Sequence, residues 1–252
     1  EMSKNLMNGF RLWEKLLYSR GGLLGRDVKI IIYDDKSDPQ TAKSLYEQLI
    51  LKDKVDLLFG PYSSEITEAI LPLTEKYGYP VIASGASSDN LFQKGYRYIF
   101  GVYAPASRYS VGFFEMVVRE GLKDIAIVHA DDLFSKEFAD GTKRWIERFG
   151  LNMVLSEGFK KGAENFDGFA RKVKASKAQV LIVCGYLDEA VNMRLSLERI
   201  GWYPKAYFAT IGPTTQAFHD RLGKDAEYAF SASVWDSNAT FPGSKKFYDS
   251  FV

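Results

Sequence analysis

The sequence predicts an α/β protein built on parallel β-sheets, and two observations lead to this class. Short apolar runs typical of buried strands recur about every two dozen residues, and helical patterns lie between most of them. Strands and helices that alternate at this pitch are typical of βαβ units with right-handed crossovers. The alternation breaks once, after Ala86, so we expect two doubly wound lobes with a ligand cleft between them instead of one continuous sheet.

The expected elements can be placed in order along the chain. The strand-like runs are 28–33, 55–59, 80–83, 125–129, 153–156, 180–184, 206–210 and 228–232. A helix over 2–18 precedes the first of them. Asp38-Pro39 predicts the start of a helix over 41–53, because Asp is a good N-cap and Pro is favoured at the first helical position. The apolar residues between Ile66 and Tyr77 recur with helical spacing, and a last helix is expected from Ser244 to the end of the chain.

The break in the alternation also predicts the domain organisation. We expect a first lobe over 1–104, a second lobe over 105–235 and a return crossover over 236–252, with crossings near 103–107 and 235–237. A helix ahead of the first strand suggests that an initial strand is missing, and further carboxyl-terminal elements are expected to be missing as well. Because Glu1 is not a start methionine, we expect a signal peptide to have been removed.

The composition argues against several classes of function. The chain has 33 Lys and Arg against 32 Asp and Glu, so its charge favours neither nucleic acid nor a membrane surface as partner. No apolar run approaches the roughly 18 residues of a membrane span. The single cysteine, Cys184, lies in an apolar run and is predicted to be a buried core thiol. No set of Cys and His has the spacing of metal ligands, so we expect neither a metal nor a cofactor.

Two segments rich in small and hydroxyl-bearing residues follow consecutive predicted strands. They are 60–64, with the sequence Gly-Pro-Tyr-Ser-Ser, and 83–88, with the sequence Ala-Ser-Gly-Ala-Ser-Ser. The carboxyl ends of parallel strands meet at one edge of a sheet, which is where α/β proteins bind ligands. Backbone N–H groups and hydroxyls gathered there suit the anionic end of a small molecule. The alternative is structural, with Ser63 or Ser64 serving as an N-cap and Gly85 as a turn residue.

With these residues in view, the chain resembles the type I periplasmic binding proteins, and more narrowly the substrate-binding proteins of branched-chain amino-acid ABC transporters. The segments that carry the resemblance, in the family's order, are 20–26, 33–39 with Ala42, 60–64, 84–88, 123–128 and 185–190. The resemblance implies a non-enzymatic, extracytoplasmic protein, periplasmic or a surface lipoprotein. It would act as a monomer and hand a small carboxylate-bearing ligand to a membrane permease.

The resemblance also implies the ligand-binding residues. Ser64, Ala86 and Ser88 fall where the family holds an α-carboxylate. Phe134 replaces the first tyrosine that the second lobe usually contributes, and Tyr186 retains the second. Further aromatic candidates for the apolar body of the ligand are Tyr62, Tyr103 and Trp235.

One expected group is missing. The acidic residue that accepts the ligand's ammonium in the family falls near Gly212, which has no side chain. Asp188 or Asp131 could substitute for it. Otherwise the departure favours a branched or aromatic carboxylate that lacks an α-amine, because an ammonium in a closed cleft needs a partner.

Three other functions compete with transport. Asp34, Asp35 and Asp38 at a strand end could form the Mg²⁺ pocket of a phospho-receiver, but the later strand ends, at Gly60 and Ser84, lack its remaining residues. A hydrolase would need a nucleophile beside one of the two histidines, His129 or His219, and no G-x-S-x-G elbow occurs. A ligand-sensing receptor ectodomain of the same fold stays open, since only flanking sequence separates it from a transport component.

Overall fold

The computed structural model describes residues 2–236 and 239–251. It divides into two compact units. Unit 1 comprises Glu1–Ser87, Leu91–Tyr103 and Val234–Val252, and unit 2 comprises Ser88–Asn90 and Ala104–Ser233. Ser237, at the predicted second crossing, lies outside the described residues. The predicted boundaries of the lobes and of the return crossover stay predictions.

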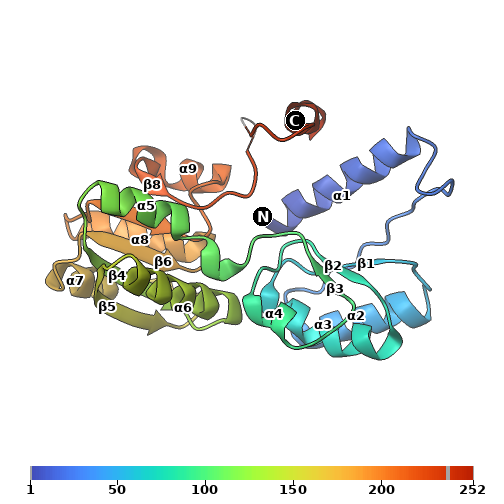
Figure 1. The fold of residues 1–252 in the computed structure, drawn as a ribbon, viewed down its shortest axis with the longest axis horizontal. Helices are drawn as coiled ribbons and strands as arrows, with labels where there is room; N and C mark the ends of the chain where they lie inside the picture. Colours follow the sequence, from blue (N-terminus) through green and yellow to red (C-terminus); the bar gives the residue numbers. More distant parts are fainter. Residues whose placement is uncertain (1, 237–238, 252) are drawn as a thin grey trace. The chain divides into compact units, whose positions relative to one another are not determined.

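Unit 1 contains a parallel sheet of three strands in the order β1-β2-β3 (Figure 1). The strands are β1 (Leu58–Phe59), β2 (Val81–Ala83) and β3 (Ile99–Gly101), and the helices are α1 (Met2–Tyr18), α2 (Pro39–Leu51), α3 (Ser64–Tyr77), α10 (Ser244–Phe251) and most of α4 (Asp89–Gln93). Helix α2 begins at the predicted cap. The Asp38 carboxylate accepts from the Thr41 N–H at 2.7 Å, and Pro39 has no backbone N–H that would need a partner in the first turn.

The prediction of a strand over 28–33 is wrong. No residue of this segment joins a β-ladder among the described residues, and the side chains of Ile31, Ile32 and Tyr33 are 39%, 45% and 40% exposed. A strand needs a neighbour for its backbone groups. Here a cavity of about 970 Å³ is lined both by this segment and by residues of β1, and the Ile30 N–H donates to the Glu14 carboxylate of α1 at 2.7 Å.

Unit 2 contains a parallel sheet of five strands in the order β5-β4-β6-β7-β8 (Figure 1). The strands are β4 (Asp124–Ala130), β5 (Asn152–Phe159), β6 (Val180–Cys184), β7 (Ala206–Ala209) and β8 (Ala229–Phe230). The helices are η1 (Ala106–Arg108), α5 (Val111–Arg119), α6 (Leu133–Arg148), α7 (Asp167–Ala175), α8 (Leu187–Arg199), α9 (Gln216–Leu222) and η2 (Gly223–Ala226). This is the doubly wound α/β arrangement that the sequence predicts.

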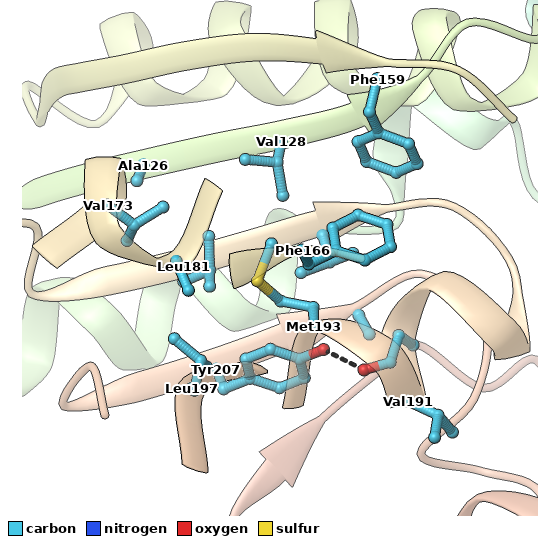
Figure 2. Packing of buried hydrophobic residues seen from close by; sticks show 14 of the residues in the cluster. Ala126, Val128, Phe159, Phe166, Val173, Leu181, Val191, Met193, Leu197 and Tyr207 are labelled. Atoms are coloured by element: carbon cyan, nitrogen blue, oxygen red, sulfur yellow. Dashed lines mark hydrogen bonds between the residues drawn. The ribbon is translucent and has the colours of Figure 1, made fainter. Parts of the chain in front are cut away.

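Alternating side chains of the unit 2 strands build two hydrophobic cores, one on each face of the sheet. Ile125 and Ile127 of β4 pack with apolar residues of α5 and α6. Ala126 and Val128 face the other way and pack with α7, α8 and α9 (Figure 2). The buried Tyr207 belongs to this second core, where its hydroxyl donates to the Ala190 carbonyl at 2.8 Å (Figure 2). Both faces of the sheet are therefore covered, as in other doubly wound folds.

None of the helices in the described part of the chain is both long enough and apolar enough to cross a membrane. Cys184 is fully buried in β6, as predicted, and burial raises the pKa of its thiol well above the usual value. Such a thiol is not poised for chemistry.

Candidate functional site

The two hydroxyl-rich segments of unit 1 lie side by side at the carboxyl ends of β1 and β2, which pair in parallel. The Gly60 N–H donates to the Ile82 carbonyl at 2.7 Å, and the Ser87 N–H donates to the Ser64 hydroxyl at 3.3 Å. Ser64 and Ala86 are 2% and 1% exposed. The structure therefore brings these two predicted residues to one edge of the sheet, while their contact with a ligand stays a prediction.

Ser63 lies in the first hydroxyl-rich segment, and the sequence left open whether it caps a helix or faces a ligand. It precedes α3 with extended backbone (φ −77°, ψ 136°), yet its side chain makes no capping bond. Its buried hydroxyl oxygen has no hydrogen-bond partner among the described residues. A buried hydroxyl without a partner costs about 1–3 kcal/mol, so it is a natural donor to a bound anion. The signal in the sequence was the pair of adjacent serines after the turn.

Ser88 is the third predicted carboxylate ligand. It is fully buried, and it belongs with Asp89 and Asn90 to unit 2. The structure thus assigns Ser88 and Ser64 to different units. Its predicted role is untested.

The second half of the predicted site lies at the topological switch point of the unit 2 sheet. Strand β4 is flanked by β5 on one side and β6 on the other, so the chain winds in opposite directions from the β4–β6 pair. Ligands of open α/β sheets bind outside the carboxyl ends of strands at such a point. Phe134 follows the end of β4 and Tyr186 follows the end of β6, and their ring centroids are 5.8 Å apart.

Phe134 and Tyr186 differ in what they offer a ligand. Phe134 is 6% exposed and also packs on Tyr109, with 6.3 Å between ring centroids. Most of its side chain is therefore buried against other residues of unit 2. Tyr186 is only half-buried, and the Lys161 ammonium lies 5.5 Å from the centre of its ring. A phenol beside a cation at the switch point suits a polar or anionic aromatic ligand better than a purely apolar one.

Glu189 fixes the backbone beneath Tyr186 and was missed by sequence reasoning. Its carboxylate is 3% exposed and accepts from the Tyr186 N–H and the Gly162 N–H, both at 3.0 Å. A buried carboxylate held by backbone donors ties the loop after β5 to the start of α8. The signal that could have found it is its position three residues after Tyr186 at a helix start, which is the spacing of a capping box.

Each of the two candidate acceptors for an ammonium already has one partner. Asp188 is an exposed residue whose carboxylate forms an ion pair with Arg221 at 2.5 Å. Asp131 accepts from the Lys161 N–H at 2.8 Å, and this hydrogen bond holds its pKa below the usual value. The position near Gly212 cannot supply a replacement, since a Cβ there would lie 3.0 Å from the Phe218 ring, and the φ of +136° disfavours any side chain.

The remaining aromatic candidates divide by their surroundings. A Cβ on Gly85 would lie 2.8 Å from the Tyr62 ring, so Tyr62 packs against the backbone of the second hydroxyl-rich segment. Tyr103 is half-buried, and burial raises its pKa. The Trp235 indole N–H donates to the Ser244 hydroxyl at 3.1 Å, and its ring lies edge-on to Phe247. Trp235 therefore packs against α10, and its contact with a ligand stays a prediction.

The competing sites have structural explanations. Asp34 and Asp35 accept turn N–H groups at 2.9 and 2.8 Å, and Asp38 caps α2. No cluster of three potential metal ligands occurs in the part of the chain that the structure describes. The His129 ring is hydrogen-bonded to the Ala130 carbonyl, and the ring of the exposed His219 is hydrogen-bonded to the Pro213 carbonyl. Among the described residues, neither histidine is hydrogen-bonded to a serine or cysteine nucleophile, so these contacts do not form a hydrolase arrangement.

Parallel α/β units that carry hydroxyl-bearing and aromatic residues at the carboxyl ends of their strands are typical of proteins that bind small ligands. Comparison with known proteins identifies the family. The profile of the family described as periplasmic binding protein matches residues 1–252, and the chain belongs to this family. The prediction of a binding protein instead of an enzyme is thereby confirmed.

Individual relatives agree with this assignment. The chain is 25% identical over 171 residues to an amino acid binding protein of Pseudomonas aeruginosa, a match that covers 68% of this chain and 46% of that protein. It is 23% identical over 261 residues to Leu/Ile/Val-binding protein homolog 7 of Brucella suis, covering 96% of this chain and 64% of that one. The chain thus spans about half to two thirds of the length of these relatives.

A solved structure has the same fold. The branched-chain amino acid transporter substrate-binding protein LivJ of Streptococcus pneumoniae, in complex with isoleucine, superposes with a TM-score of 0.88 at 22% sequence identity. The match covers 98% of this chain and 71% of LivJ. At this identity the likeness establishes the fold and leaves the ligand open.

Proposed function

We propose that this chain is the ligand-binding part of an extracytoplasmic solute-binding protein that delivers a small carboxylate to an ABC-transporter permease, and that it acts as a monomer. The observation that carries the proposal is the edge of unit 1, where the Ser64 hydroxyl accepts the Ser87 N–H and the buried Ser63 hydroxyl has no hydrogen-bond partner among the described residues. Several donors at one place are what a desolvated carboxylate requires.

We further propose that the ligand contacts both units, with its carboxylate on unit 1 and its body beside Tyr186 on unit 2. Aromatic rings supply buried area and shape preference, and a phenol hydroxyl can orient a polar substituent. Closure of two lobes on one ligand would exclude water from the carboxylate and strengthen its hydrogen bonds.

Within the class of carboxylates, the proposal favours acids without an α-amine. Gly212 offers no acceptor, Asp188 is paired with Arg221, and Asp131 already accepts a backbone hydrogen bond. A protein of the same fold from Rhodopseudomonas palustris is solved in complex with 3,4-dihydroxybenzoic acid, with a TM-score of 0.81 and 17% identity, covering 99% of this chain and 68% of that one. Leucine-like amino acids are the alternative, in keeping with the names of the relatives.

Two measurements test the proposal. Mass spectrometry of small molecules released when the purified protein is denatured would identify a retained ligand. Calorimetry would then compare leucine with 4-methyl-2-oxopentanoate, and phenylalanine with phenylpyruvate. We expect tighter binding of the acids that lack an amine.

The amino acids could instead bind more tightly. If that preference disappeared in Asp188→Asn, the ammonium acceptor would be Asp188 and the favoured ligand class would be wrong. Absence of binding by every carboxylate tested, together with no released ligand, would contradict the function itself.

A further inference from the structure

A group of three arginines on unit 2 surrounds a hollow of about 340 Å³ that no part of the proposed ligand site uses. The hollow is lined by Asp89, Pro105, Ser107, Arg108, Arg144, Trp145 and Arg148. Arg144 and Arg148 are one turn apart on α6, and Arg108 ends η1. We call these residues the arginine hollow.

The floor of the arginine hollow is rigid. A Cβ on Gly141 of α6 would lie 2.4 Å from the Ser107 Cα, so only glycine lets α6 and η1 approach this closely. The Trp145 indole N–H donates to the Ser107 carbonyl at 2.8 Å. Asp89 accepts from the Ser107 N–H at 3.0 Å and from its hydroxyl at 2.7 Å. These bonds hold η1 and α6 in one arrangement before anything binds.

The charges in the hollow are not balanced by their surroundings. All three guanidinium groups belong to exposed residues, and none of them forms an ion pair with any described residue. Asp89 is the one carboxylate in the lining, and both its oxygens are engaged by Ser107. Like charges at i and i+4 of a helix destabilise it, and Arg144 and Arg148 have this spacing. An anionic partner would remove that repulsion.

An apolar anchor lies among the charges. The half-buried Trp145 rests on the core beneath α6, and the Arg148 guanidinium lies 5.2 Å from the centre of its ring. Tryptophan and arginine are the residues most enriched where protein interfaces concentrate their binding energy. Planar guanidinium groups also match carboxylates in paired hydrogen bonds.

We propose that the arginine hollow docks an acidic segment of a partner protein, with carboxylates on the three arginines and an apolar side chain against Trp145. A protein segment fits better than a single small anion, because the guanidinium groups are distributed over two elements and stay open to solvent. A small anion there would be weakly desolvated and screened by salt. This inference concerns the arginine hollow alone and does not depend on which ligand unit 1 holds.

The test uses the whole chain and a short fluorescent peptide in which glutamates flank a leucine. Fluorescence anisotropy measures binding at low and at high ionic strength. The variant R144Q/R148Q should bind roughly two- to fivefold more weakly for each arginine removed and should lose much of the salt dependence. The control R171Q/K174Q removes the same charge from exposed positions of α7, and it should bind like the wild type.

Several outcomes would overturn the proposal. Equal weakening in both double variants would mean non-specific attraction to positive charge. Binding of inorganic phosphate, or of vesicles that contain phosphatidylglycerol, in preference to the peptide would assign the hollow to a small anion or a membrane surface. A peptide in which glutamine replaces glutamate should not bind, and its binding would also contradict the proposal. Thermal melts of both variants check that they fold.

Discussion

At the residue scale, the Ser64 hydroxyl has one observed contact and one proposed role. It accepts the Ser87 N–H at 3.3 Å and thereby connects the two hydroxyl-rich segments, and it is proposed to donate to the ligand's carboxylate. Removing a partner from a buried charged group costs about 1–3 kcal/mol. We expect Ser64→Ala to weaken ligand binding by that amount in calorimetry with the ligand identified by mass spectrometry.

The control for this prediction is Ser44→Ala, which removes an exposed hydroxyl of α2 that donates to the Gln40 carbonyl of the same helix. It should leave affinity unchanged. If Ser64→Ala also bound with wild-type affinity, Ser64 would serve only to connect the two segments, and the carboxylate would have to lie elsewhere.

Gly212 gives a second prediction at this scale. Its φ of +136° and the 3.0 Å approach of the Phe218 ring leave no room for a side chain. We expect Gly212→Asp to lower the free energy of unfolding by about 1–3 kcal/mol, measured by urea denaturation, through backbone strain and crowding. The substitution should therefore not create an ammonium site.

A matched glycine distinguishes strain from a general effect of adding a side chain. Gly112 in α5 has ordinary backbone angles and nothing within 4 Å of a Cβ, so Gly112→Ala should stabilise the protein by about 0.4–1 kcal/mol. Wild-type stability of Gly212→Asp would mean that the family's acidic position can be restored here and that the argument for amine-free ligands is weaker.

The candidate site could be predicted from the sequence only in part. The two hydroxyl-rich segments were expected at one edge because consecutive parallel strands deliver their ends to the same edge. The choice of Ser64 and Ala86 within them rested on the family resemblance, and their contact with a ligand stays a prediction. Whether Ser63 caps a helix or faces a ligand was left open, since a hydroxyl that has no partner is visible only in three dimensions. The ion pair between Asp188 and Arg221 joins residues 33 apart in the sequence, so no local sequence pattern predicts it.

At the element scale, the cap of α2 depends on pH. The Thr41 N–H donates to the Asp38 carboxylate and holds its pKa below the usual value, because the hydrogen bond favours the charged form. Its contribution to stability is therefore complete above the carboxyl's unfolded pKa of about 4 and is lost as the pH falls through the lower folded pKa. We expect Asp38→Asn, which keeps an oxygen acceptor without a titrating group, to melt with less acid dependence than the wild type.

The measurement is the difference in melting temperature between the two proteins from pH 7 downward, where the wild type should lose its advantage below about pH 4. The control is Asp140→Asn, on the exposed face of α6, where the carboxylate forms only a surface ion pair with Lys143. A constant difference across the acid range would show that the Asp38 charge contributes nothing to the cap.

The strands differ in how well their sequences predicted them, and the reason is their neighbours. Strands β4 and β6 were found because continuous apolar runs are buried on both faces. The segment 28–33 has a comparable apolar pattern, yet it forms no ladder in the described chain, and it lines a hollow together with residues of β1. Conversely, the sequence did not predict β3, because Ile-Phe-Gly is a short run that ends in glycine. Its pairing with β2 allows it to form a strand nevertheless.

At the scale of the whole molecule, the two units differ in how completely their apolar side chains are buried. Unit 2 has a five-stranded sheet with a hydrophobic core on each face. Unit 1 has a three-stranded sheet and a hollow of about 970 Å³ that is lined partly by exposed apolar side chains such as Leu24 and Ile32. Apolar side chains that stay exposed contribute less to the free energy of folding than buried ones do. We therefore infer that unit 1 is the less stable of the two.

Scanning calorimetry of the ligand-free protein should accordingly resolve two transitions, with unit 1 unfolding first. Two buried positions assign them. Leu71→Ala in α3 removes a fully buried side chain of unit 1 and should move only the lower transition, whereas Ile127→Ala in β4 does the same in unit 2 and should move only the upper one. Each should cost about 2–5 kcal/mol in its own unit. A single transition that both variants shift equally would mean that the units unfold cooperatively, and their separate packing would then not determine the stability of the molecule.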